Sequence, residues 1–442
     1  MSITRRRALQ LGSAAALFGL ASGFARADDA ATGGEILRQW YKVVLHLVRH
    51  TATYSPPVAS RAFAYLGVAS YQAVASGSTT LVSLAGQLNG LKELPPRDPN
   101  KTYSDAVITH CVLASACKTF FGNTGPTGQR VMAAAEKKLK GDALQGLPDD
   151  VVTASLAYGE ALKAAIIDWS ANDGGAVIEN MGFPMAYEVS KLPGHWVPTS
   201  AIRQQQFPLL PKWGLNRTFA MPSGANCGLS GPPAYSEDPS STFFSMAKEV
   251  YDVTTHLTPD QVAIARFWSD DPMLSPTPPG HWIGIANDLL EQEKAGLDRS
   301  AEVMMRLGVA MADGFIGCWN AKFQYDYIRP VTVIKKLIDA KWEPLLITPP
   351  FPEYPSGHST ESGAAAAVLT SLYGENFAFT DHTHERDGLG DRSFRSFEEA
   401  ANEAGMSRMY GGIHFRPAIE QGLEQGRCIA QFAIGLRTRS ST

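Results

Sequence analysis

The sequence of 442 residues predicts an all-α protein. Apolar residues recur every three or four positions over several long stretches, which is typical of helices with one buried face. The alternation of apolar and polar residues that marks strands is scarce. Long Pro- and Gly-rich segments separate the helical stretches, so we expect helices joined by extended loops.

The helices can be placed in chain order. In the N-terminal half we expect them over 35–50, 57–76, near 104–121 and 151–171. A later helix begins at Thr258, because this residue can cap the helix, Pro259 suits the first helical position and Gln261 can close a capping box. Ser396 opens another helix with the same kind of pattern.

Two regions break the helical pattern. Residues from about 172 to 240 are rich in Pro, Gly and Trp, and are too long for an ordinary connector. They form either a cover over a site or a linker between helical halves, and their aromatic content favours a packed cover. The second region, 380–392, holds the His and Asp residues Asp381, His382, His384, Asp387 and Asp391. A metal site is one interpretation, but a solvated polar loop is favoured because no helix or turn fixes a ligand spacing.

The first residues predict an export signal. Arg5 and Arg6 resemble a twin-arginine motif, and residues 25–27 fit a small-x-small cleavage pattern. A membrane anchor is the alternative, but the apolar run over 11–23 is too short to span a bilayer. We therefore expect a periplasmic or secreted protein whose mature chain begins at Asp28 and does not stay inserted in a membrane.

The expected organisation is a signal peptide over 1–27 and one helical domain over 28–442. An N-terminal half would cover about 28–240 and a catalytic C-terminal half about 241–442. The 39 Lys+Arg residues are balanced by 43 Asp+Glu residues, which argues against nucleic acid as a partner. A phosphate-like ligand must then be held by a local cluster of charges.

The five cysteines are odd in number and scattered, which argues against a disulfide framework. No Cys and His spacing of a metal site is present. Cys111 and Cys117 are interpreted as buried thiols on one helix.

The stretch EYPSGHSTES places Pro355, Ser356, Gly357 and His358 in the first turn of an expected helix. Backbone N–H groups at a helix start have no partner within the helix, so they can bind an anion. A histidine beside such a site can transfer protons. An ordinary capped helix start is the simpler interpretation of this stretch alone.

Three basic residues and a second histidine accompany this stretch. Lys322 and Arg329 are seven residues apart, so we expect both on one helix face, with Pro330 ending that helix. His414 follows a Gly-Gly turn near Arg408. Singly, such residues are more often solvated or structural. Jointly they can hold a tetrahedral or trigonal-bipyramidal oxyanion.

The ordered motifs resemble those of the type 2 phosphatidic acid phosphatase and vanadium-dependent haloperoxidase superfamily. They are Lys322 with Arg329–Pro330, then 355–358, then Arg408 with His414. The resemblance implies two four-helix bundles around one active site and one vanadate per chain, without haem. Vanadate would be bonded to His414 and hydrogen-bonded by the remaining motif residues, which are Lys322, Arg329, Ser356, Gly357 and Arg408. His358 would transfer protons and Lys322 would polarise the bound oxidant.

Flanking residues are similar to the chloroperoxidase-like branch. Trp319 and Phe351 resemble its aromatic lining, and Asp271 would orient the motif arginine Arg408. One departure is Ala418, which stands where the superfamily often has an aspartate that orients the histidine. Glu420 or a backbone carbonyl would replace that aspartate, or the role would be absent. This weakens the case for a phosphatase, whose histidine must be an activated nucleophile.

The resemblance therefore implies that hydrogen peroxide oxidises iodide and bromide to hypohalous acid, with chloride as a further candidate. An organic acceptor and a homo-oligomer are compatible with it. Two alternatives stay open: an exported acid phosphatase that uses His414 as its nucleophile, and a non-catalytic oxyanion-binding protein.

Overall fold

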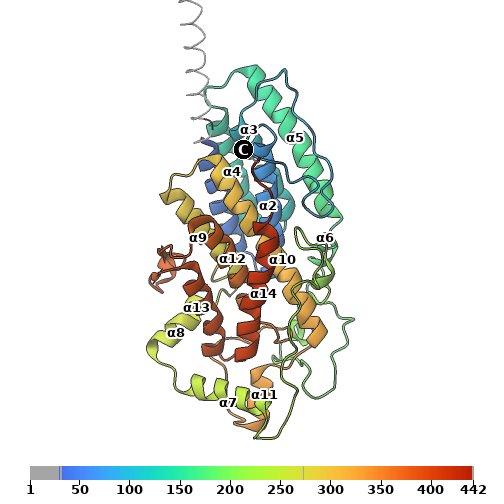
Figure 1. Cartoon of the computed structure of the whole chain (residues 1–442), viewed down its shortest axis with the longest axis vertical. Helices are drawn as coiled ribbons and strands as arrows, with labels where there is room; N and C mark the ends of the chain where they lie inside the picture. The colour runs from blue at the N-terminus through green and yellow to red at the C-terminus, as the bar shows by residue number, and fades with distance from the viewer. Residues whose placement is uncertain (1–28, 30–31, 272, 441–442) are drawn as a thin grey trace, which may run out of the picture.

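The computed structural model describes residues 29, 32–271 and 273–440 (Figure 1). The expected signal peptide over 1–27 lies outside these residues. Within them, no helix combines the length and the hydropathy needed to cross a bilayer.

The N-terminal helices lie close to the predicted positions. They are a helix over 32–49, α2 (Pro56–Ala75), α3 (Asp105–Phe120), α4 (Pro126–Leu144) and α5 (Asp149–Ala171). Helix α2 is buried along almost its whole length and packs against α10 (Leu297–Tyr325), the long helix in the middle of Figure 1. The two backbones approach closely, because a Cβ on Gly67 would lie 2.7 Å from Cα of Met305. This close packing explains the many small residues of the predicted 57–76 helix.

The C-terminal helices pack around the other end of α10. They are α9 (Thr277–Gln292), α12 (Gly357–Tyr373), α13 (Phe397–Tyr410) and α14 (Arg416–Ile434). Helices α12 and α14 also touch through backbone, since a Cβ on Gly426 would lie only 2.0 Å from the carbonyl oxygen of Thr360. The two groups of helices share α10, and the all-α prediction is confirmed.

Shorter elements complete the described chain: α6 (Gly175–Ile178), η1 (Arg203–Gln206), η2 (Trp213–Leu215), α7 (Thr242–Thr255), α8 (Pro259–Phe267), α11 (Pro330–Leu337) and η3 (Glu385–Asp387). The predicted capping box is present, with Thr258 and Gln261 bonding reciprocally at the start of α8. Ser396 likewise caps α13 through the N–H of Glu399.

The prediction that Lys322 and Arg329 share one helix is wrong. Helix α10 ends at Tyr325, and Asp326 adopts a left-handed conformation with φ of 45°. Pro330 then occupies the first position of α11 and begins that helix. Arg329 is therefore the residue that precedes α11, and the two cations come from different elements.

The segment over 172–240 is a packed cover. Trp196, Leu210 and Trp213 in it are at most 1% exposed. Backbone N–H groups of 219–221 all donate to the buried carboxylate of Asp313 on α10. The cover is thus fixed to the central helix, as its aromatic content predicted.

One disulfide corrects the expectation from the cysteine count. Cys227 in the cover is bonded to Cys428 on α14, across a sequence separation of 201 residues. Because the two cysteines are so far apart in the sequence, no local spacing between them could indicate the bond. Cys111 and Cys117 are buried free thiols on α3, as predicted.

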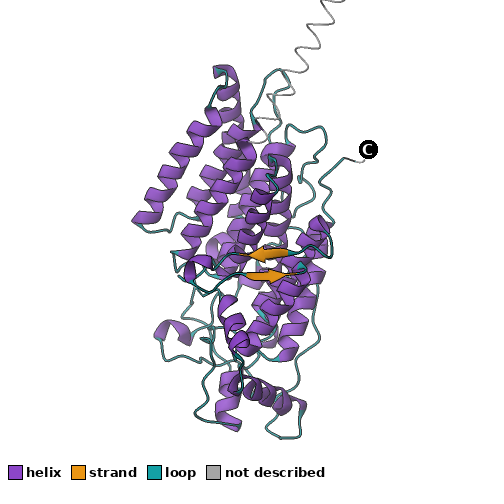
Figure 2. Cartoon of the chain, turned by 90° about the vertical axis from the view of Figure 1, so that its left-hand side faces the viewer, coloured by secondary structure: helices purple, strands orange, loops and turns teal. Residues whose placement is uncertain are grey.

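The segment over 380–392 is not the solvated loop that we expected. It contains β1 (Phe379–Asp381) and part of β2 (Arg392–Phe394), which pair antiparallel and lie side by side in Figure 2. Asp381 and His384 are only 2% and 3% exposed. They are buried because the hairpin folds against α9 and its His281.

Candidate active site

A cavity of about 430 Å³ lies where the cover meets the helices of the C-terminal group. The first turn of α12 contributes Gly357 and His358, and α13 and its following turn contribute Arg408 and His414. The predicted aromatic and acidic residues also line it, namely Trp319, Phe351 and Asp271. The other predicted site residues, Lys322, Arg329 and Ser356, lie fully buried behind this wall.

The start of α12 is a capped helix start. Ser356 is the N-cap, and its Oγ accepts the N–H of Ser359 at 3.3 Å. The backbone N–H of Ser356 donates to the carbonyl of Ala418 at 3.0 Å, which ties this turn to α14. Gly357 and His358 are then the first helical residues, at the end of the helix that attracts anions.

His414 is held by a carboxylate that the sequence did not reveal. Its Nδ1–H donates to Oε1 of Glu353 at 2.9 Å, and the N–H of Phe415 donates to the same oxygen at 2.8 Å. The other ring nitrogen, Nε2, accepts from Nη1 of Arg329 at 3.2 Å. Burial and the cations Arg329 and Lys322 hold the pKa of His414 well below its ordinary value. The ring is therefore neutral, with its lone pair on Nε2.

Glu420 does not have the orienting role suggested for it. It is largely exposed and lies 3.9 Å from Arg416. Glu353, in contrast, is fully buried and lies only three residues before Ser356. An acidic residue inside the apolar run FPEYP was the available signal, because a buried carboxylate needs a partner.

The three motif cations are buried without a carboxylate beside them. Lys322 donates to the carbonyls of Pro352, at 2.8 Å, of Glu353 and of Pro355, and Arg408 donates to the carbonyl of Trp268 at 2.7 Å. Arg329 bonds the carbonyls of Phe351 and Ile413. Among the described residues, no carboxylate forms an ion pair with any of the three cations.

The electrostatic consequence is a site whose three cations have no directly bonded carboxylate, and Asp271 and Glu353 act on them only through space. Burial lowers the pKa of Lys322 to about 7, that of Arg329 to about 9 and that of Arg408 to about 10. Nη2 of Arg329 and Nε of Arg408 are buried with no hydrogen-bond partner in the described part of the chain. A bound anion would accept hydrogen bonds from these donors and would raise the lowered pKa values of the three cations.

Nε2 of His358 resembles the buried, unpartnered donors of Arg329 and Arg408. This atom is buried without a hydrogen-bond partner and lies 4.0 Å from Oδ2 of Asp270. Burial and then the charge of Arg408 hold the pKa of His358 well below its ordinary value. A neutral imidazole at the cavity wall can accept or donate a proton.

Asp271 lies in the cavity wall but makes no hydrogen bond to Arg408 among the described residues. Burial raises the pKa of Asp271, and the charge of Arg408 opposes that rise. The two groups therefore interact through space. An orienting role for Asp271 stays a prediction.

Two rings form the apolar wall. The ring centroids of Trp319 and Phe351 are 5.0 Å apart, and Nζ of Lys322 lies 5.1 Å from the Phe351 centroid. The indole N–H of Trp319 donates to the carbonyl of Leu209 in the cover at 3.2 Å. The same tryptophan thus shapes the cavity and anchors the segment that closes it.

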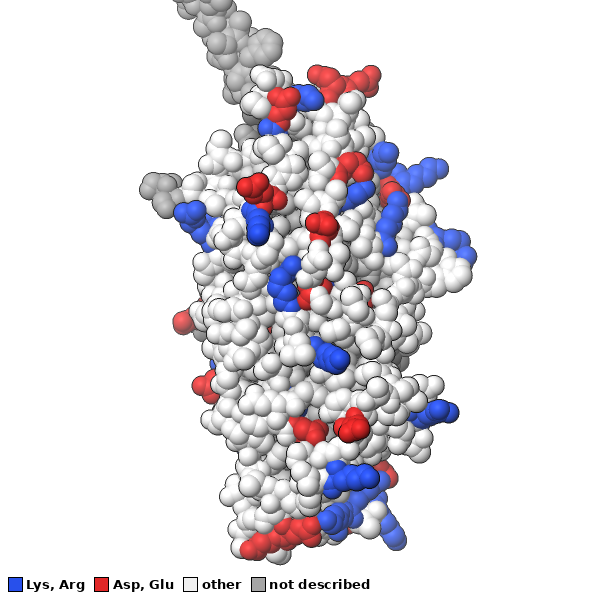
Figure 3. All heavy atoms as spheres, turned by 90° about the vertical axis from the view of Figure 1, so that its right-hand side faces the viewer, with Lys and Arg blue, Asp and Glu red and all other residues white. Residues whose placement is uncertain are grey.

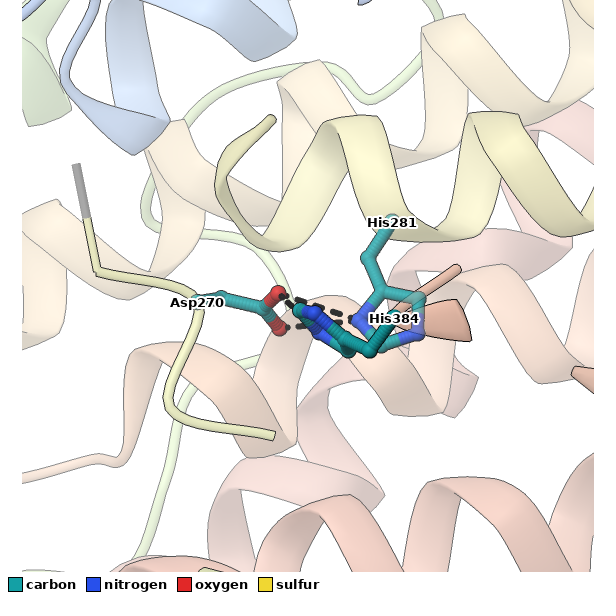
Figure 4. Close-up of side chains that lie close together, drawn as sticks. All are labelled: Asp270, His281 and His384. Carbon is teal, nitrogen blue, oxygen red and sulfur yellow. Dashed lines mark hydrogen bonds and ion pairs between the residues drawn. The ribbon is translucent and has the colours of Figure 1, made fainter. Parts of the chain in front are cut away.

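A second cluster of charged groups lies behind the cavity wall, around Asp270. His281 and His384 both face this carboxylate (Figure 4), and ligand-type atoms of the three residues lie within 4.8 Å of one another. Nδ1 of His281 lies 3.0 Å from Asp270, and its Nε2 lies 2.7 Å from Asp381. The two carboxylates overcome burial and raise the pKa of His281 to about 10. The ring is an imidazolium with no lone pair for a metal ion, so these residues are better described as a charge network.

Comparisons with known proteins agree with this architecture. Residues 302–440 match a family model described as the VCPO second helical-bundle domain. A search of curated proteins gave no match. Two solved structures, of the holo and apo types of a bacterial vanadium-dependent chloroperoxidase, are 17% and 16% identical, with TM-scores of 0.66 and 0.61. They cover 87% and 86% of this chain, and 93% and 92% of their own, and show the fold alone.

A further solved structure is much more similar in sequence. It is described as the first bacterial vanadium-dependent iodoperoxidase, and it is 38% identical with a TM-score of 0.83. The alignment covers 92% of this chain and 97% of that one. Identity at this level over nearly the whole of both chains establishes common membership. The chain belongs to the vanadium-dependent haloperoxidase family.

Proposed function

We propose that this protein oxidises halide ions with hydrogen peroxide to hypohalous acid, with vanadate as its cofactor. The observation that carries the proposal is the set of three buried cations without carboxylate partners around the Nε2 atom of His414. Such an arrangement is costly unless an oxyanion occupies it.

The residues present fit one vanadate per chain. His414 would supply the bond to vanadium through Nε2, while Lys322, Arg329 and Arg408 would neutralise its oxygens. Ser356 and the N–H of Gly357 would donate further hydrogen bonds. The unmet donors Nη2 of Arg329 and Nε of Arg408 are the observation that supports this fit. When bound, vanadate supplies Lewis-acid activation of peroxide.

The chain's own residues supply orientation and proton transfer. Glu353 fixes the tautomer of His414 that leaves Nε2 free of a proton. His358 holds or releases a proton at Nε2, at the edge of the cavity. Trp319 and Phe351 exclude water beside Lys322, which strengthens the field of its ammonium group.

The charges that matter are local. On the face drawn in Figure 3, basic and acidic side chains are interspersed and neither sign covers the surface. That face therefore carries no broad electrostatic field of one sign, and the buried cations are the local feature proposed to hold the anion.

Iodide and bromide are the proposed substrates, and oxidation of chloride is the reaction that tests the role of the aromatic wall. The 38% identical relative is described as an iodoperoxidase. The aromatic wall formed by Trp319 and Phe351 is the feature that favours the halides that are more difficult to oxidise than iodide. Export to the periplasm or beyond is proposed from Arg5, Arg6 and residues 25–27 of the sequence.

One observation supports a phosphatase activity as a second candidate. The missing aspartate at Ala418 argued against a nucleophilic His414, but Glu353 provides the carboxylate from another direction. Activity on phosphate esters is therefore a second candidate function.

A pair of assays separates the two. Purified protein is incubated with vanadate, peroxide and bromide in the presence of a phenol dye, and separately with a chromogenic phosphate ester and no vanadate. We expect vanadate-dependent bromination and little ester hydrolysis. Rapid hydrolysis with no bromination would reverse the assignment.

A further inference from the structure

We propose that Asp270, His384 and Asp387 form a proton relay that feeds His358 from a second cavity on the protein surface. The proposal rests on the haloperoxidase function proposed above and deepens it. His384 and Asp270 are positioned to act through His358, so they are relay residues and not catalytic ones.

The reaction itself requires a proton supply. Its balance is halide plus H2O2 plus H⁺ giving hypohalous acid plus water. The halide loses two electrons, the O–O bond breaks, and one oxygen leaves with the halogen. The other oxygen leaves as water, and for this it takes up one proton in each cycle. Halide, peroxide and product share the active-site cavity, which Trp319 and Phe351 line in part, so a separate path for the proton would leave that cavity to them.

The structure contains a second cavity at the other end of the charge network. It has a volume of about 570 Å³ and is lined by Arg49, Asp288, Thr383 and Asp387 among others. Asp270 lines the active-site cavity and Asp387 lines this second one. His384 lies between the two carboxylates, so a short chain of titratable groups joins the cavities.

The distances follow this chain step by step. Nδ1 of His384 lies 2.9 Å from Oδ2 of Asp387, and its Nε2 lies 3.8 Å from Oδ1 of Asp270. Oδ2 of Asp270 lies 4.0 Å from Nε2 of His358. Shortening the two longer steps by about 1 Å brings them into the usual hydrogen-bond range.

Two ring nitrogens without hydrogen-bond partners support proton transfer from His384 toward His358. Nε2 of His384 and Nε2 of His358 are both buried without a hydrogen-bond partner among the described residues. Both face the carboxylate of Asp270, and Figure 4 shows the ring of His384 turned toward it. A carboxylate between two such rings can pass a proton from one to the other.

His281 keeps Asp270 in place while the proton moves. Its Nδ1 lies 3.0 and 3.1 Å from the two oxygens of Asp270, and its other nitrogen is held by Asp381. Charged groups from several elements face the relay: Asp270 before α9, His281 on α9, Asp387 in η3, Arg49 on the helix over 32–49, Glu361 on α12 and Arg408 on α13.

In each transfer, one bond forms as another breaks. The proton leaves the carboxyl group of Asp387 for Nδ1 of His384, and the proton on Nε2 passes to Asp270. Asp270 then gives its proton to Nε2 of His358. Solvent in the second cavity then reprotonates Asp387. His384 is left with its proton on Nδ1, so its ring must turn over and exchange the two nitrogens before it can pass the next proton.

The test uses the full chain with saturating vanadate and compares His384→Gln with His256→Gln. The control residue is an exposed histidine at the end of α7, whose Nδ1 lies 2.9 Å from the carbonyl oxygen of Asp252, and it lines neither cavity. We expect kcat of His384→Gln for bromide oxidation to fall by up to about 10²-fold near pH 8, with KM values unchanged. The loss should shrink near pH 5 and be reversed by added imidazole, and His256→Gln should match the parent.

A second measurement does not depend on turnover. In vanadate-free protein with ¹⁵N-labelled histidine, Asp270→Asn should shift the ring signals of both His358 and His384. His256→Gln should shift neither.

The outcomes that overturn the relay are distinct. A His384→Gln variant with the parent's pH profile removes it, as does a loss that is equal at all pH values and accompanied by weaker vanadate binding. A stoichiometric divalent ion that disappears in His384→Gln would also overturn it, in favour of a metal site. A parent protein without vanadate-dependent turnover overturns the proposed function, and the relay with it.

Discussion

Two buried clusters of charge lie beside each other in this protein, and they are built on opposite rules. Around His281, each ring nitrogen faces a carboxylate, Asp270 on one side and Asp381 on the other. Around His414, the cations Lys322, Arg329 and Arg408 have neutral carbonyls, the neutral ring of His414 or nothing as partners. Balanced charge is satisfied within the fold, whereas unbalanced charge marks the place of a ligand.

The strongest test of this difference removes the proposed metal ligand. His414→Ala should lose both retained vanadate and bromination, because no other side chain is proposed to bond the metal. Retention is measured as vanadium per chain after gel filtration. Full vanadate-dependent activity in this variant would falsify the assignment.

The balanced cluster should respond in stability. Asp381→Asn leaves the buried imidazolium of His281 with one carboxylate, so the free energy of unfolding should fall by about 3–5 kcal/mol. Denaturant unfolding measures it. The matched control is Asp391→Asn on the same hairpin, whose His382 partner is exposed, with an expected change below about 1 kcal/mol. Equal effects of the two changes would remove the contrast.

The unbalanced cluster should show itself in the pH dependence of stability. The pKa of Lys322 is lowered to about 7 in the fold, so the unfolded chain binds more protons above that pH. Vanadate-free protein should therefore gain stability as pH rises from about 7 toward 10, by at most about 4 kcal/mol.

The comparison for that prediction is between variants. Lys322→Met should lose the gain, while Lys138→Met, at an exposed position, should keep it. Bound vanadate should abolish the gain in the parent, because the anion keeps Lys322 charged. A parent and a Lys322→Met variant with parallel pH curves would contradict the idea.

A smaller effect is expected from the carboxylate behind His414. Glu353→Gln should weaken vanadate binding by about 10–100-fold, since Glu353 sets the tautomer of the ligand. Glu420→Gln is the control and should bind as the parent does. Calorimetric titration with vanadate compares them, and equal affinities would leave Glu353 with a packing role.

The smallest expected effect concerns the aromatic wall. Phe351→His introduces a polar group beside Lys322, so chlorination should fall by about tenfold while iodide oxidation is retained. Dye chlorination at acidic pH measures the first, and iodide oxidation serves as the internal control. Undiminished chlorination would show that the wall only packs.

Local patterns predicted much of this molecule. Apolar periodicity located α2, α3 and α5, and capping chemistry located the starts of α8 and α13, because each depends on residues a few positions apart. The segments with Lys322, Ser356 and His414 were found in the same way, and the fold brings them to one cavity. The shared helix of Lys322 and Arg329 was wrong, since Pro330 can either end a helix or begin one. The solvated loop over 380–392 was also wrong, because its burial against α9 is a contact across the fold.

Pairings across the fold were beyond that kind of reasoning. Glu353 meets His414 over 61 residues, and Asp381 meets His281 over 100. The disulfide from Cys227 is more distant still. Nothing near any of these residues in the sequence signals its partner, because the contact exists only after the helices have packed.

The composition of the cavity wall has a consequence for the survival of the enzyme. Hypohalous acid attacks thioethers, thiols and phenols readily. The protein has 12 Met, 5 Cys and 14 Tyr, yet none of them is among the described residues that line the cavity. Trp319, His358 and His414 are the oxidisable residues of the lining, and Trp319 and His414 are only 1% and 3% exposed. The product is therefore released past a wall without thioethers, thiols or phenols, which reduces the damage that the enzyme does to itself.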